Sequence, residues 1–60
     1  MVNVEEIKEK LLQQFSSLHL KSLSEDSLYK KLFNTYKDID IDEIEQIKQH
    51  LKDNGITVIE

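Results

Sequence analysis

The residues that could perform catalysis are few, and their spacing does not suit it. His19 and His50 are the only histidines in a chain without cysteine, and they lie too far apart in sequence for a zinc-ligand motif. The serines cluster near expected helix ends, where capping accounts for them, and none sits in a glycine-flanked nucleophile turn. A single glycine also excludes the common phosphate-binding loops. The sequence therefore predicts no enzyme, no cofactor and no metal site.

Acidic side chains are the most unevenly distributed chemical groups. One run places five acids within eight residues with no base among them, and two more acids lie upstream. One interpretation is that a few of them cap a helix and complement its dipole while the others keep the surface hydrated. The other is that they form an anionic surface for a basic partner, since capping needs only one or two. The candidate partner-binding residues are Asp38, Asp40, Asp42, Glu43 and Glu45, followed by Glu25 and Asp26.

Length and composition limit the class of protein. Sixty residues allow one small domain over 1–60, and without cysteine it must be held together by its 38% hydrophobic residues. The lack of disulfides favours a cytoplasmic setting, and no apolar run approaches the length of a membrane span. Twelve acids against eight lysines give a net charge of −4, which disfavours nucleic acid as a partner. We expect a monomer that binds protein.

Three segments combine a capping side chain with apolar residues at three- and four-residue intervals, which predicts three helices. They cover about 4–16, 25–35 and 41–53, with Asn3, Ser24 and Asp40 as N-caps. The predicted inward-facing residues are Val4, Ile7, Leu11, Phe15 and Leu18 in the first helix, Leu28 and Leu32 with Tyr29, Phe33 and Tyr36 in the second, and Ile41, Ile44, Ile47 and Leu51 in the third.

A short β-strand is expected at the end of the chain. Gly55 suits a left-handed helix cap, and the β-branched residues of 56–59 favour a strand, which needs a partner. The segment 18–22, predicted to be extended, is the expected partner. The order helix, short strand, helix, helix, strand predicts a mainly α, three-helix domain of reduced winged-helix (helix-turn-helix-like) type. A plain three-helix bundle with a trailing tail is the alternative.

Direct reading of DNA fits the sequence poorly. In a helix-turn-helix the third helix enters the major groove, yet the predicted third helix carries a net charge of −2. Lys30, Lys31 and Lys37, beside two tyrosines, form a weak phosphate-binding patch. DNA binding therefore stays a third alternative.

Several motifs together resemble a known family. They are Leu23-Ser24-Glu25-Asp26-Ser27-Leu28, Asp40-Ile41-Asp42-Glu43-Ile44, Leu51, Gly55-Ile56 and Thr57-Val58-Ile59-Glu60. In this pattern the chain resembles region 1.1, the N-terminal domain of primary bacterial sigma factors. Ile41 stands where that family often has proline, and the first helical turn tolerates this substitution.

The resemblance implies a function in transcription. A region 1.1-like domain would occupy the basic DNA channel of RNA polymerase as a DNA mimic, and would restrain free sigma from binding promoters. The expected partners are then core RNA polymerase or other sigma regions. The alternative is a small stand-alone regulator, phage- or plasmid-like, that uses the same fold to bind another protein, with Tyr29, Phe33 and Tyr36 as a candidate apolar patch.

Overall fold

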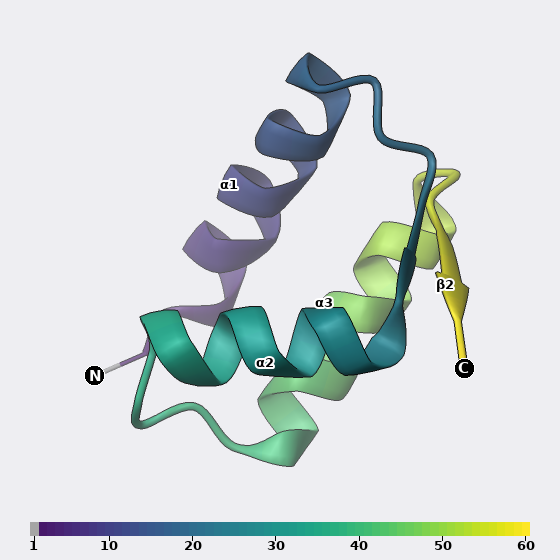
Figure 1. Ribbon diagram of the computed structural model, residues 1–60. Helices are drawn as coiled ribbons and strands as arrows, with labels where there is room; N and C mark the ends of the chain where they lie inside the picture. Colours follow the sequence, from purple (N-terminus) through teal and green to yellow (C-terminus); the bar gives the residue numbers. More distant parts are fainter. Residues whose placement is uncertain (1) are drawn as a thin grey trace.

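The computed structural model describes residues 2–60, which form three helices and two short strands. In chain order these are α1 (Val4–Ser17), β1 (Ser22–Ser24), α2 (Glu25–Thr35), α3 (Ile41–Asp53) and β2 (Thr57–Ile59). The helix α2 crosses α3, α1 packs on α3, and the strands lie at the end of the molecule where α1 and α3 finish (Figure 1). The mainly helical, three-helix fold predicted from the sequence is confirmed.

Local capping explains where each helix begins. Asn3 accepts a hydrogen bond from the Glu6 amide at 3.2 Å, and Ser24 accepts one from the Ser27 amide at 3.1 Å. These side chains satisfy amides that have no partner inside the first helical turn. Ser24 is also the last residue of β1, so the strand passes into α2 without a loop.

The same backbone motif terminates α1 and α3. The Ile56 amide donates to the Leu51 carbonyl at 3.0 Å, around Gly55 with its φ of +88°. Leu20 donates in the same way to the Phe15 carbonyl at 2.8 Å, around His19 with a φ of +56°. Both are Schellman-type ends, in which a left-handed residue turns the chain back onto the last carbonyls.

The cap around His19 shows that segment 18–22 is not extended throughout, as the sequence had predicted. Leu18 ends α1 as its C-cap and is 66% exposed, so it does not belong to the inward-facing stripe. Two parallel strands form instead with Leu23 opposite Val58, after the chain has turned at His19. The predicted partner 18–22 is therefore right only at its end: Ser22 pairs with Thr57, and the Lys21 carbonyl accepts a hydrogen bond from the Thr57 amide at 2.9 Å, whereas residues 18–20 complete the helix cap.

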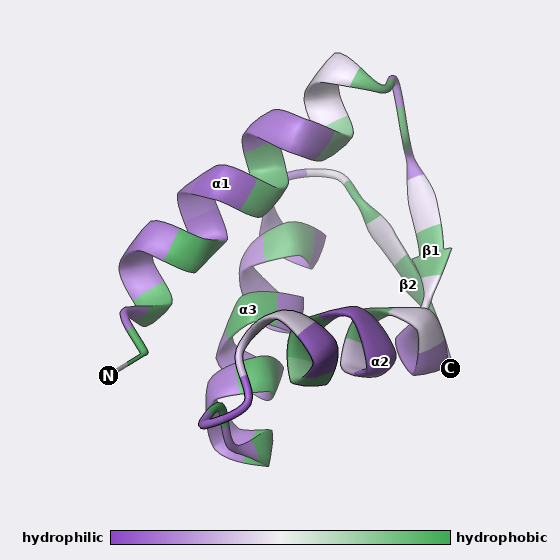
Figure 2. Ribbon diagram, turned by 60° about the vertical axis from the view of Figure 1, so that its left-hand side comes forward, coloured by the Kyte–Doolittle hydropathy of each residue, from purple (hydrophilic) through white to green (hydrophobic). Residues whose placement is uncertain are grey.

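The core lies among the inward faces of the three helices, and the apolar positions that supply it recur along each of them (Figure 2). The parallel pair covers one end of the core through Leu23 and Val58, while the neighbouring Ser22 and Thr57 are exposed. The buried apolar residues are Ile7, Leu11, Phe15, Leu28, Leu32, Ile39, Ile44, Ile47, Leu51, Ile56 and Val58.

Two predicted core positions are corrected. Ile41, the first residue of α3, is 59% exposed, and Ile39 in the preceding loop is buried in its place. Phe33 is 41% exposed, whereas Tyr29 and Tyr36 are half-buried at the rim of the core. The buried face of α3 consists of Ile44, Ile47, Lys48 and Leu51, and Ile41 lies outside it at the first helical position. Within residues 2–60, no helix combines the length and apolar character needed to cross a membrane.

Candidate functional site

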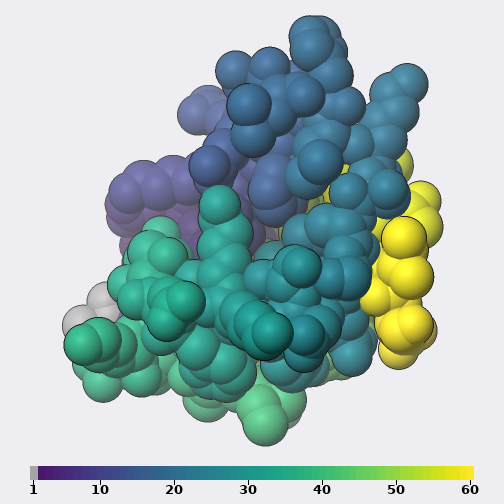
Figure 3. Space-filling model, viewed as in Figure 1, coloured from purple at the N-terminus to yellow at the C-terminus, as the bar shows by residue number. Residues whose placement is uncertain are grey.

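The acidic run surrounds the start of α3, at the lower edge of the molecule in Figures 1 and 3. We use the term anionic surface for its five acids, Asp38, Asp40, Asp42, Glu43 and Glu45. The structure places all five on one turn and the loop before it, as the sequence predicts. The five carboxylates differ in their contacts: some cap the helix, one binds a lysine, and two have no such partner among residues 2–60.

Asp40 and Glu43 form a reciprocal capping box. The Glu43 amide donates to Asp40 Oδ1 at 2.8 Å, and the Asp40 amide donates to Glu43 Oε1 at 3.0 Å. Both carboxylates remain near solvent, and their negative charge is favourable beside the positive end of the helix dipole. They therefore stabilise the fold while still adding charge to the surface.

Glu45 and the upstream Glu25 are held by a buried lysine. Lys48 is only 8% exposed, and its Nζ lies 2.8 Å from Glu25 Oε2 and 3.1 Å from Glu45 Oε1. The Tyr29 hydroxyl donates to the other oxygen of Glu45 at 2.6 Å. This Lys48 network joins α2 to α3, and a buried ammonium needs such partners to offset its lost hydration.

The pKa values of the network follow from these contacts. The hydrogen bond from Tyr29, and then the one from Lys48, lower the pKa of the Glu45 carboxyl below its ordinary value. The same Glu45 hydrogen bond raises the pKa of the Tyr29 hydroxyl. Glu25, and then Glu45, raise the pKa of the Lys48 ammonium. Lysine, tyrosine and carboxylate thus keep their ordinary protonation states at neutral pH, and the network is a structural clamp.

Asp38 and Asp42 behave differently from the other acids. Both are exposed, and among residues 2–60 neither lies in an ion pair or a side-chain hydrogen bond. Asp26, the remaining predicted residue, pairs with Lys30 across one turn of α2 at 3.2 Å, in an exposed pair worth little. The two aspartates are therefore the acids most available to a partner.

Basic groups on α3 are scarce. Lys48 is buried in its ion pairs with Glu25 and Glu45. In the described chain, Lys52, in the last turn, is therefore the one lysine of this helix that faces solvent. The predicted cluster of Lys30, Lys31 and Lys37 is exposed, but Lys30 is paired with Asp26. A helix with this charge distribution repels a phosphate backbone.

Sequence reasoning missed the burial of Lys48. The signal was present, because Lys48 follows Ile44 by four residues and Leu51 follows Lys48 by three, the spacing of an inward-facing stripe. Within residues 2–60 no group of histidine and acidic side chains is arranged to hold a metal ion. His50 is half-buried, and its Nε2 lies buried without a hydrogen-bond partner among residues 2–60.

Comparison with known proteins assigns no relative. No family model, no curated protein and no solved structure matches this chain significantly.

Proposed function

We propose that this chain is a non-enzymatic, cytoplasmic domain of the transcription apparatus that resembles sigma region 1.1. Its anionic surface would bind the basic DNA channel of RNA polymerase in place of DNA, and would restrain promoter binding by free sigma. The observation that carries the proposal is the sign of the charge at the start of α3. Exposed Asp38 and Asp42 lie there beside two capping acids, in a small, mainly helical three-helix domain.

The physical basis is competition for the same cations. Lysines and arginines that line a DNA channel bind phosphates, and carboxylates at similar spacing can take their place. Such binding is driven by exposed charges, so it weakens as salt screens them. The Lys48 network supports an order of priority among the predicted residues. Because Lys48 neutralises part of the charge of Glu25 and Glu45, we assign direct partner contact to Asp38 and Asp42 first.

The test is a titration of fluorescently labelled domain with core RNA polymerase at low and then rising salt. We expect binding at low salt that declines steeply with ionic strength. The double substitution Asp38→Asn with Asp42→Asn should weaken it. The matched control removes the same charge from α1, with Glu5→Gln and Glu9→Gln, both exposed. Absence of binding at low salt, or equal weakening by both variants, would refute the proposal.

A second candidate is a stand-alone regulator that binds a different protein through an apolar contact. The exposure of Phe33 favours it, because 41% of a large aromatic residue is open to solvent. Phe33→Ser should then abolish capture of the partner while the two aspartate substitutions leave it unchanged. The reverse pattern supports the sigma-like function.

A further inference from the structure

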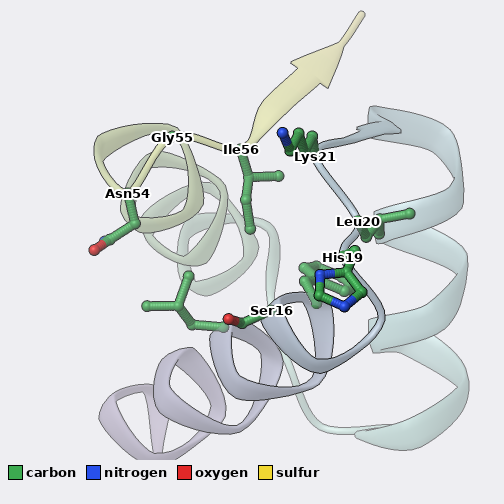
Figure 4. A pocket seen from close by; sticks show the side chains of 9 residues that line it. Ser16, His19, Leu20, Lys21, Asn54, Gly55 and Ile56 are labelled. Atoms are coloured by element: carbon green, nitrogen blue, oxygen red, sulfur yellow. The ribbon is translucent and has the colours of Figure 1, made fainter.

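A groove lies at the end of the molecule opposite the anionic surface. It has a volume of about 600 Å³ and runs between the end of α1, the connector to β1 and the turn from α3 to β2. Figure 4 shows His19, Leu20 and Lys21 on one side and Asn54, Gly55 and Ile56 on the other, with Ser16 at its base. The groove and the anionic surface lie at opposite ends of α3, whose 13 residues span roughly 20 Å at about 1.5 Å per residue.

The lining of the groove combines apolar and polar side chains. Leu12, Phe15 and Ile56 supply much of the apolar part of the lining. His19, Lys21 and Asn54 supply polar side chains around it (Figure 4). This volume and this combination of surfaces fall within the range of binding clefts. A Cβ added to Gly55 would meet no atom within 4 Å, so the groove is open on that side.

The charge of the lining is opposite to that of the chain as a whole. Twelve acids against eight lysines give the protein its net charge of −4, yet the formally charged side chain in the lining of the groove is Lys21, and the lining holds no acid. An uncompensated lysine beside apolar surface favours a carboxylate that arrives with an apolar group.

The helix ends would work against binding of a carboxylate if their carbonyls were free. Both α1 and α3 end at the groove, and the C-terminus of a helix carries a partial negative charge. Here the structure satisfies most of the final carbonyls internally. In α1, Phe15 and Ser16 carbonyls accept the Leu20 and His19 amides. In α3, the His50, Leu51 and Lys52 carbonyls accept hydrogen bonds from Asn54, Ile56 and Gly55, respectively. These carbonyls are therefore already hydrogen-bonded within the chain.

An exposed leucine continues the apolar surface at the edge of the groove. Leu20 lines the groove, is 37% exposed, and its side chain points away from Ser16 and Ile56 in Figure 4. A small compound seated between those residues would leave the Leu20 side chain uncovered, whereas an extended polypeptide can cover both.

We propose that this groove is a docking site for an extended acidic segment of a partner protein. The segment places an aliphatic side chain against Leu12, Phe15 and Ile56, and a neighbouring carboxylate beside Lys21. The inference is independent of the anionic surface, so either proposal can fail alone.

The test uses three capped pentapeptides and the ¹⁵N-labelled domain. The probe is Asp-Leu-Asp-Leu-Asp, the charge control is Lys-Leu-Lys-Leu-Lys, and the apolar control is Asp-Ser-Asp-Ser-Asp. We expect the probe alone to shift the amide resonances of Leu20, Lys21, Gly55 and Ile56. Octanoate serves as a further arm, and binding as tight as that of the probe would indicate a small-molecule site and overturn the proposal.

Two matched substitutions locate the contact. Lys21→Glu should weaken probe binding about tenfold, while Lys31→Glu, an equally exposed change of the same charge on α2, should leave it unchanged. Leu20→Ser should also weaken it. Shifts confined to other residues, equal binding of the lysine peptide, or equal effects of the two lysine variants would each overturn the proposal. So would the absence of any shift at saturating probe.

Discussion

The two Schellman-type helix ends offer a direct measurement of backbone strain. Gly55 occupies the left-handed position after α3, whereas α1 places His19 in the equivalent position. A side chain at positive φ brings its Cβ close to the backbone, and glycine avoids that contact. We predict that His19→Gly raises the free energy of unfolding.

The magnitude follows from two opposing terms. The left-handed conformation costs a non-glycine residue about 1–2 kcal/mol. Removing that cost with glycine is partly offset, because glycine loses about 0.4–1 kcal/mol more conformational entropy on folding than histidine does. The net gain is about 0.5–1 kcal/mol. For a chain of this length, with a total stability of about 3–9 kcal/mol, this corresponds to an increase in Tm of about 2–8 °C.

Gly55→Ala is the mirror experiment. The added Cβ has no neighbour within 4 Å, so the loss reports the backbone alone. We expect stability to fall by about 0.5–1 kcal/mol, as the same two terms reverse in sign.

Urea unfolding followed by circular dichroism measures both changes. The decisive control is His19→Ala, which removes the imidazole but keeps a Cβ at positive φ. It should leave stability near that of the original chain. If alanine stabilises the protein as much as glycine does, the gain comes from losing the imidazole, and the strain argument is refuted.

Three further predictions follow from the core, the Lys48 network and the capping box. Ile44→Ala should cost about 2–5 kcal/mol, because the side chain is fully buried, whereas Ile41→Ala, one turn earlier and mostly exposed, should change urea stability by less than about 0.5 kcal/mol. The pKa of Glu45 is lowered in the folded protein, so its contribution is present above the ordinary value of 4.5 and is lost as pH falls through the depressed folded value. Glu45→Gln should therefore flatten the acid limb of stability against pH, and an unchanged limb would contradict the network. Asp40→Ala should cost about 0.5–2 kcal/mol in thermal unfolding while Asp40→Asn retains most of the stability, since asparagine also caps; equal losses would contradict a capping role.

The sequence by itself determined the three helices, where each begins, and how α3 ends. Asn3, Ser24 and Asp40 cap the helices that they were predicted to cap, and Gly55 ends α3 with a positive φ. These features depend on contacts between residues at most five apart in the chain, so composition and spacing carry the information. The acidic run was equally visible, because its members are neighbours in sequence.

Only the tertiary structure decided which acidic side chains are held by a lysine of this chain and which are free of such contacts among residues 2–60. Glu25 and Glu45 were predicted as partner contacts, but the buried Lys48 holds both, and its contact with Glu25 spans 23 residues. The strand partner and the exchange of Ile41 for Ile39 in the core were also decided at this level. Periodicity shows that a helix has an inward face. It cannot show how far that face turns at the first residue, or which distant side chain meets it, because both depend on how the helices cross.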